Sequence, residues 1–347
     1  MGKIDIKSMS LSELQSDFSK LGLQKFRAGQ VYNWLSSGAG SFDEMTNLSK
    51  DLRAKLQELY FIPVCQIEVK RVSKLDGTVK YLYKLFDGEY VEAVVMRYHH
   101  GISICISSQA GCKMGCSFCA TGKNGFKRNL SASEMLSQIQ AAEKDIGERI
   151  SNVVLMGMGE PLDNYDNVIR FLELVSSDEG MNIGMRHISL STCGIADRIY
   201  DLADRKMQLT LSVSLHAPND AIRDSMMPVN KKWNVNEVLK ACKYYSDTTN
   251  RRISFEYAMI KGVNDSDACA NELAGRLKGI LSHVNLIPVN DVTGSGYTKS
   301  GGERLKAFAG ILSRHGFTAT VRRTLGSDIE ASCGQLRGKV IREEKTL

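Results

Sequence analysis

The chain has 347 residues, of which 43% are hydrophobic and 24% charged, and its formal net charge is +6. This composition suffices for one large domain, alone or with a small one, and excludes a disordered or collagen-like chain. No apolar run approaches the roughly 18 residues that cross a bilayer, and the start, MGKIDIKSMS, lacks the apolar segment of a signal peptide. We therefore expect a cytoplasmic protein, whose modest positive charge suits an anionic partner without requiring one.

The cysteine content is the unusual feature of the composition. An odd number of cysteines without a secretion signal argues against a disulfide framework and indicates metal or redox chemistry. The nine cysteines are Cys65, Cys105, Cys112, Cys116, Cys119, Cys193, Cys242, Cys269 and Cys333.

The first 95 residues predict a small helical unit followed by short strands. Leu11, Leu14 and Phe18 keep helical spacing, and Ser10 with Glu13 matches a capping box. Two further helices are expected around Trp34 and Leu56. Asp-Gly turns separate the expected strands, which are Gln66–Arg71, Val79–Phe86 and Tyr90–Arg97.

From about residue 100, strands and helices alternate regularly. The expected strands are Ile102–Ser108, Asn152–Met156, His187–Thr192, Leu209–His216, Arg252–Ile260, His283–Asn290 and Phe317–Thr324. The expected helices are Ser131–Asp145, Tyr165–Ser176, Ala196–Lys206, Asn234–Ser246, Asp265–Leu281 and Gly302–His315. This alternation predicts a parallel sheet, and an open or closed β/α barrel is favoured over a doubly wound sheet. In a barrel, functional residues gather on the loops after the strands.

The loop after the first of these strands contains Cys112, Cys116 and Cys119 in a C-x3-C-x2-C spacing. A structural zinc site normally needs four protein ligands, whereas three thiolates suit a [4Fe–4S] cluster with one open iron. A zinc site that takes a distant fourth ligand is the alternative.

The next loop adds a second motif, Gly157-Met-Gly-Glu160-Pro161. A C-x3-C-x2-C loop with an aromatic residue, Phe118, before its last cysteine resembles the radical S-adenosylmethionine (SAM) superfamily. In that superfamily, a glycine-rich segment with a glutamate contacts the amine of SAM after the second barrel strand, and glycines permit this close approach.

Longer segments narrow the resemblance to one family. The stretches CISSQAGCKMGCSFCATG, GFKRNL, GMGEPLDNYDNV, SVSLHAPND and RRTLGSDIEASCGQLRGK are similar, in this order, to those of the RlmN/Cfr family of radical SAM RNA methyltransferases. The resemblance implies an α/β fold: a radical SAM partial (β/α)6 barrel over residues 96–347. It also implies a small helical accessory domain, helix-hairpin-helix-like and with connecting strands, over residues 1–95.

Two activities occur in this family. RlmN members methylate C2 of an adenosine in 23S rRNA and in certain tRNAs, whereas Cfr members methylate C8 of the same ribosomal adenosine. This chain has GMGEPLDN where Cfr members typically have GMGEALAN, so C2 methylation is expected. C8 methylation is the nearest alternative, and a non-catalytic, zinc-stabilised RNA-binding protein is an alternative of another class.

The resemblance also implies a mechanism that uses two SAM molecules per turnover. One methylates the Cys333 thiolate, and a second, bound at the [4Fe–4S] cluster, yields a 5′-deoxyadenosyl radical that removes hydrogen from the new methyl group. The resulting methylene radical adds to C2, the adduct then loses one electron, and Glu92 takes the C2 proton. Cys105 then attacks the sulfur of Cys333 to release the product, and a thiol system reduces the Cys105–Cys333 disulfide.

Cofactor contacts and partners carry over by position. The implied SAM-binding residues are Gly159, Glu160, Ser191, Ser214, Leu215, His216 and Asn290. The implied partners are 23S rRNA, tRNA and a flavodoxin- or ferredoxin-like electron donor, and a monomer is expected. Basic pairs such as Arg322 and Arg323 are candidates for phosphate contacts. Cys65, Cys193, Cys242 and Cys269 match no functional position, so we expect them to pack in the core.

Overall fold

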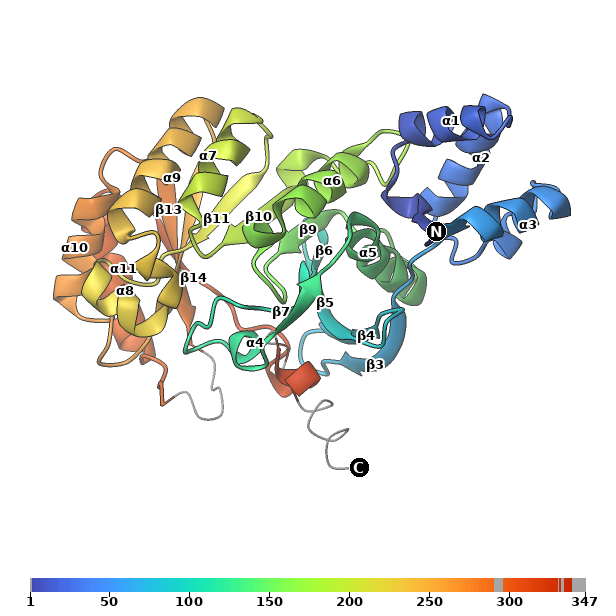
Figure 1. Cartoon of the computed structure of the whole chain (residues 1–347). Helices are drawn as coiled ribbons and strands as arrows, with labels where there is room; N and C mark the ends of the chain where they lie inside the picture. The colour runs from blue at the N-terminus through green and yellow to red at the C-terminus, as the bar shows by residue number, and fades with distance from the viewer. Residues whose placement is uncertain (1, 290–295, 330, 332–333, 339–347) are drawn as a thin grey trace.

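A computed structural model describes residues 2–289, 296–329, 331 and 334–338. The N-terminal residues form a helical unit at one end of the molecule (Figure 1). Its elements are β1 (Ile4–Asp5), α1 (Leu11–Lys20), α2 (Lys25–Ser36), α3 (Lys50–Leu59) and β2 (Tyr60–Phe61). The predicted capping box is confirmed, because Ser10 and Glu13 exchange side-chain and backbone hydrogen bonds at the start of α1. This unit has its own apolar core, which includes Leu14, Phe18 and Tyr60.

One ten-stranded sheet dominates the rest of the chain, in the order β14-β13-β12-β11-β10-β9-β6-β5-β4-β3. Its strands are β3 (Gln66–Val72), β4 (Val79–Lys84), β5 (Tyr90–Tyr98), β6 (Gly101–Cys105), β9 (Asn152–Leu155), β10 (Ile188–Thr192), β11 (Thr210–Ser214), β12 (Ile253–Met259), β13 (Ser282–Pro288) and β14 (Ala319–Val321). The pairs from β6 to β14 are parallel, and β3, β4 and β5 add an antiparallel extension.

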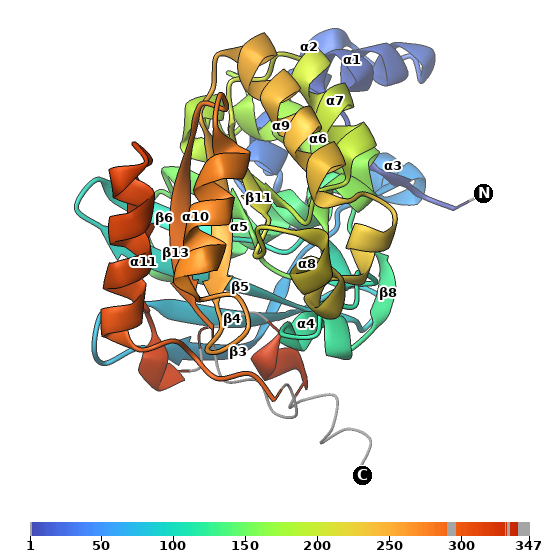
Figure 2. The ribbon, with the colours of Figure 1, turned by 90° about the vertical axis from the view of Figure 1, so that its left-hand side faces the viewer.

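The connecting helices lie outside the curved sheet, as Figure 2 shows from the side. They are α5 (Ala132–Ile146), α6 (Tyr165–Ser176), α7 (Ala196–Asp204), α9 (Val235–Thr249), α10 (Asp267–Leu277) and α11 (Gly302–Arg314). The predicted α/β architecture with a parallel β/α arrangement is thus confirmed. Within the described ranges, no helix is both long and apolar enough to span a lipid bilayer.

The ends of two predicted strands differ from the structure for identifiable local reasons. β11 stops at Ser214, two residues early, because His216 has a positive φ of 58° that no strand accommodates. β10 begins at Ile188 because a 3-10 turn occupies Met185–His187. The prediction did not include α4 (Ala120–Lys123), α8 (Asp220–Met226) or the hairpin of β7 (Gln109–Gly111) and β8 (Phe126–Asn129). These elements are short and belong to loops, so they carry little periodicity.

The predicted domain boundary at residue 95 stays a prediction. The separate N-terminal core ends at Tyr60, and the three strands before residue 98 belong to the large sheet. β5 pairs with β6 in antiparallel orientation, and Val94 lies opposite Cys105. The antiparallel extension is therefore part of the same sheet as the parallel strands.

The two faces of the parallel strands differ in polarity. On β12, Phe255 and Tyr257 point to the core under the helices, whereas Glu256 and Ala258 line a cavity. The neighbouring strands continue this inward-facing row, because Glu256 pairs in register with Ser214 on β11 and Asn285 on β13. The inward-facing row across β11, β12 and β13 therefore carries polar side chains, although apolar residues such as Ile287 also line the cavity.

Candidate active site

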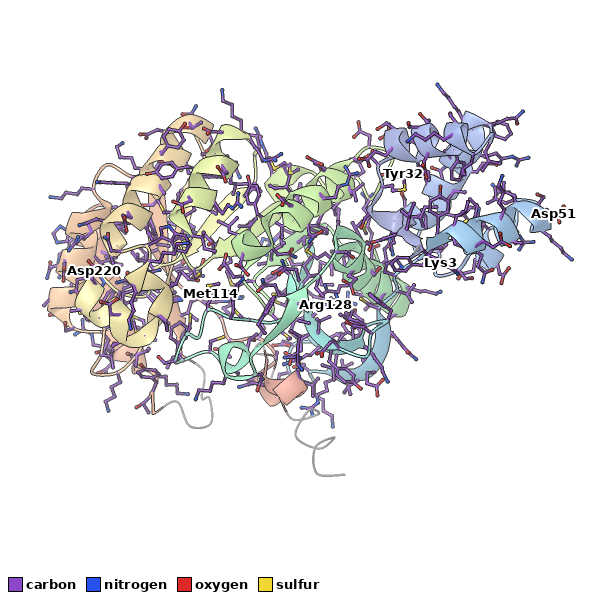
Figure 3. The ribbon with its side chains drawn as sticks, viewed as in Figure 1. Lys3, Tyr32, Asp51, Met114, Arg128 and Asp220 are labelled. Atoms are coloured by element: carbon purple, nitrogen blue, oxygen red, sulfur yellow. The ribbon has the colours of Figure 1, made fainter. Side chains whose placement is uncertain are left out.

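The three motif cysteines lie on the loop between β7 and α4, beside the open end of the parallel strands. Met114 of this loop lies between Arg128 of β8 and Asp220 of α8 in Figure 3. Two backbone hydrogen bonds hold the loop: Cys112 donates to the carbonyl of Gly125 at 3.0 Å, and Ser117 donates to the carbonyl of Met226 at 2.9 Å.

A glycine permits the entry of the chain into this loop. Gly111 has a φ of +91°, and a Cβ atom there would lie 2.0 Å from the carbonyl oxygen of Gly125. Because Cys112 follows directly, its position depends on a backbone conformation and a close approach that only glycine allows.

The three thiols of this loop are the candidate cluster ligands. Cys112, Cys116 and Cys119 form no disulfide. Burial raises the pKa of the Cys112 thiol to about 12, and burial followed by the charges of Cys119 and Cys112 also raises that of Cys116. Positive charge from bound iron stabilises such thiolates. In the described part of the chain, no three His, Cys, Asp or Glu side chains converge closely enough for a single metal ion. Three thiols on one loop, none of them in a disulfide, fit a [4Fe–4S] cluster with an open iron.

A cavity of about 300 Å³ opens at the carboxyl ends of the parallel strands. Four of the predicted site residues line it: Cys105, Cys119, Ser214 and His216. They come from β6, the cysteine loop and the end of β11, which are far apart in sequence. The structure thus brings one predicted cluster ligand, one predicted catalytic cysteine and two predicted SAM contacts to one cavity.

His216 is held rigidly at the wall of this cavity. Its Nδ1 accepts a hydrogen bond from the backbone N–H of Ala258 at 3.0 Å, and Asn264 donates to its carbonyl oxygen at 2.8 Å. Burial, followed by the charge of Arg223, lowers the pKa of His216 to about 3. The imidazole is therefore neutral, with its proton on Nε2, and offers a hydrogen-bond donor to a ligand.

Gly159 and Glu160 lie in the loop after β9, and the glutamate is not free. Its two carboxylate oxygens accept the backbone N–H groups of Leu162 at 3.0 Å and Cys193 at 2.7 Å. Burial raises the pKa of Glu160. Gly159 has a φ of +102°, and a Cβ atom there would lie 2.6 Å from that of Gln109. The glycine permits close contact with β7, which precedes the cysteine loop, and Glu160 links the loop after β9 to the residue that follows β10.

The other two described SAM-contact candidates flank the cavity without lining it. Ser191 is buried on β10, and Leu215 is fully buried between Ser214 and His216. Asn290 and Cys333 lie outside the described residues. Cys65, Cys193, Cys242 and Cys269 are buried in the main apolar core, as the sequence predicts.

Glu92 lies on β5, beside the C-terminal segment instead of at the cavity wall. Its Oε2 accepts the backbone N–H of Gly334 at 2.8 Å, and its Oε1 accepts that of Arg337 at 2.7 Å. Lys80 completes the environment with an ion pair to Oε2 at 2.9 Å, and both side chains are almost fully buried. Glu92 therefore touches the residue that follows Cys333 in the chain.

Sequence reasoning missed one carboxylate of the cavity, Glu256. Ser254 donates to its Oε1 and Asn285 to its Oε2, both at 2.8 Å. Burial raises the pKa of Glu256. Arg322, which the sequence suggested only for phosphate contacts, also lines the cavity. A charged residue inside an otherwise strand-like run was the available signal for Glu256.

Comparisons with known proteins agree with this arrangement. Residues 106–270 match the Radical SAM superfamily, and residues 4–62 match the family described as "Ribosomal RNA large subunit methyltransferase N-terminal domain". The chain is 52% identical over 339 residues to a protein of Alkaliphilus oremlandii named "Probable dual-specificity RNA methyltransferase RlmN", covering 98% of this chain and 99% of that one. A protein of the same name from Lachnospira eligens is 52% identical over 342 residues, covering 98% of this chain and 97% of that one.

A solved structure supports the same assignment. The crystal structure of a radical SAM methyltransferase from Sphaerobacter thermophilus superposes with a TM-score of 0.91 at 42% identity, covering 96% of this chain and 98% of the other. The similarity thus includes the N-terminal unit, the antiparallel extension and the parallel strands. The chain belongs to the radical SAM superfamily and, within it, to the RlmN family of RNA methyltransferases.

Proposed function

We propose that the protein methylates C2 of adenosine, at adenine-2503 of 23S rRNA and at adenine-37 of tRNA. The observation that carries this proposal is the shared cavity of Cys105 and Cys119. A cluster ligand and a separate thiol at one cavity are the requirements of a reaction that combines radical and thiol chemistry. C8 methylation is not favoured, since the relatives bear the RlmN name and the chain has GMGEPLDN.

Five cysteines of the chain would have separate roles in this reaction. Cys112, Cys116 and Cys119 would hold the [4Fe–4S] cluster, which supplies the electron for SAM cleavage when it is bound. The Cys333 thiolate would accept a methyl group from one SAM and later carry it to the base, so each turnover uses two SAM molecules. Cys105 would attack the sulfur of Cys333, forming a disulfide and releasing the methylated base. Two electrons from a thiol system then restore both thiols.

Glu92 is the proposed acceptor of the C2 proton. Its hydrogen bond to Gly334 supports a place next to Cys333. Both carboxylate oxygens of Glu92 already accept hydrogen bonds, so uptake of a proton would require the hydrogen bond from Gly334 or Arg337 to break. The test is Glu92→Gln, which should abolish methylation of RNA even in protein whose Cys333 already carries the methyl group.

The remaining SAM contacts are proposed from their positions. Ser214 and the Nε2 donor of His216 would face SAM in the cavity. Gly159, Glu160, Ser191, Leu215 and Asn290 complete the proposed set. We further propose a flavodoxin- or ferredoxin-like electron donor, a monomeric enzyme and a cytoplasmic location, where rRNA and tRNA are found.

The deciding experiment is nucleoside mass spectrometry on rRNA and tRNA from a bacterial strain that lacks its own enzyme. Expression of the chain should restore 2-methyladenosine in both RNAs, and expression of Cys119→Ala should not. The appearance of 8-methyladenosine would instead establish the Cfr-type activity. Protein reconstituted anaerobically should hold about four irons, and colourless protein with one tight zinc would support the non-catalytic alternative.

A further inference from the structure

The turn between β3 and β4 holds the C-terminal segment from one side. Asp76 accepts the backbone N–H of Gly326 at 2.8 Å through its Oδ2. Ser73 donates to Asp328 at 2.7 Å, and the backbone N–H of Lys74 donates to the same carboxylate at 2.9 Å. The sequence identified Asp76 and Gly77 only as a hairpin turn. The structure shows that this turn also contacts residues about 250 positions away.

β4 and β5 hold the same segment a few residues further on. The buried Lys80–Glu92 ion pair presents both Glu92 oxygens to the backbone N–H groups of Gly334 and Arg337. The Arg337 guanidinium donates to Glu89 on the same side at 3.0 Å. The antiparallel extension therefore holds the C-terminal segment at two places. The β3–β4 turn holds Gly326 and Asp328, and β4 and β5 hold Gly334 and Arg337.

The segment held in this way forms part of the cavity wall. Leu325, Ala331 and Gln335 line the cavity with Cys105 and Cys119. Contact with the cluster loop is close, since a Cβ atom on Gly334 would lie 2.5 Å from Thr121 Oγ1 and 2.6 Å from its backbone nitrogen. The residues held by these contacts therefore lie against both the cavity and the cluster loop.

We propose that Asp76 and the Lys80–Glu92 pair form a frame that positions Gly326, Gly334 and Arg337, and with them the described C-terminal wall of the cavity, for the proposed methyl transfer. The frame itself consists of described residues, and the inference rests on the proposed function, which assigns the methyl carrier to Cys333. Asp76 and Lys80 are positioning residues: they act through Gly326 and Glu92. A misplacement of about 1 Å between reacting groups slows a reaction by about 100-fold, so loss of the frame should affect transfer more than folding.

The test compares Lys80→Met and Asp76→Asn with a matched control, Lys70→Met. Lys70, on β3 of the same sheet, forms an ion pair with Asp145 of α5 at 2.6 Å, away from the frame contacts named above. Reconstituted holoenzymes are compared for iron content and melting temperature. Cys333 S-methylation is followed by peptide mass spectrometry, and the ratio of 5′-deoxyadenosine formed to RNA methylated is measured.

Both frame variants should retain the iron content of the control but S-methylate Cys333 at least about 10-fold more slowly. They should also form more 5′-deoxyadenosine per RNA methylated, because a radical without a placed methyl group is quenched unproductively. If these residues affected only the stability of the protein, the amounts of 5′-deoxyadenosine and of methylated RNA would fall in parallel, and their ratio would stay the same. Lys80→Arg should restore part of the coupling.

Asp76 is exposed, so Asp76→Asn keeps the test decisive if Lys80→Met does not fold. Methylation and coupling within twofold of Lys70→Met in both folded variants would overturn the frame. Failure of the proposed function looks different: the unmodified protein itself would then carry no methyl group on Cys333.

Discussion

The ring of Phe118 meets that of His216 edge to face, with 5.0 Å between centroids and an interplanar angle of 88°. Phe118 precedes a proposed cluster ligand, and His216 lies just after the end of β11. The contact therefore joins the cluster loop to the proposed SAM wall. Because a neutral imidazole packs here without the cost of burying a charge, the contact agrees with the lowered pKa of His216.

His216 makes stability depend on pH in a defined direction. Its pKa is about 3 in the folded protein and near 6.5 when exposed, so the unfolded chain takes up the proton first as pH falls. The stability contributed by neutral His216 is complete above pH 6.5 and declines towards pH 3, by about 1.4 kcal/mol per pH unit. Urea unfolding should show this decline between pH 6 and pH 4, and His216→Gln should remove that part of it. An unchanged pH slope in the variant would contradict the prediction.

Gly159→Ala should destabilise the fold by about 1–3 kcal/mol, through a strained positive φ and overlap with Gln109. The measurement is the urea midpoint of the purified protein. Gly275→Ala serves as the control, because it lies in α10 with nothing within 4 Å of a new Cβ. The control should gain up to about 1 kcal/mol, since alanine favours a helix. Equal effects at the two glycines would refute the steric argument.

Arg223→Lys should cost roughly 2–4 kcal/mol. The buried guanidinium donates from Nε to the carbonyl of Leu215 at 3.1 Å and from one terminal nitrogen to Asn230 at 2.8 Å. A lysine cannot reproduce this fork, so buried carbonyl groups lose their donors. Chemical denaturation measures the loss. Arg198→Lys, at an exposed pair with Asp201, should stay within about 0.5 kcal/mol of the unchanged protein.

Glu256→Gln should raise the melting temperature more at pH 8 than at pH 4. Burial raises the pKa of this carboxyl, so its contribution to stability is complete below its unfolded pKa and is lost as pH rises through the folded value. Glutamine keeps the hydrogen-bonding shape without the charge. Thermal unfolding of both proteins across this range is the measurement, and a constant difference between them would show that Glu256 does not titrate.

The sequence predicted the barrel well because alternation of strands and helices is a local signal. α6 spans the predicted Tyr165–Ser176, and α5 begins directly after Ser131, the first residue of the predicted helix. Cys105 and Cys119 were predicted from motifs and meet at one cavity. What sequence could not provide were contacts between distant segments. Nothing in the pattern indicated that Glu92 binds the backbone of Gly334 and Arg337, or that Asp76 binds that of Gly326.

Because the two faces of β12 have different surroundings, substitutions on each face should affect a different property of the protein. Phe255 and Tyr257 pack in the apolar core under the helices, whereas Ser254 and Glu256 lie on the opposite face of the strand and are hydrogen-bonded to each other. Odd positions should therefore govern how much folded protein a cell accumulates, and even positions how well that protein binds its ligand. In a library of single substitutions, abundance and activity should thus rise and fall in opposite phase along the strand, with a period of about two residues. Homologues with new specificities can then arise by changes at every second residue while the fold is preserved.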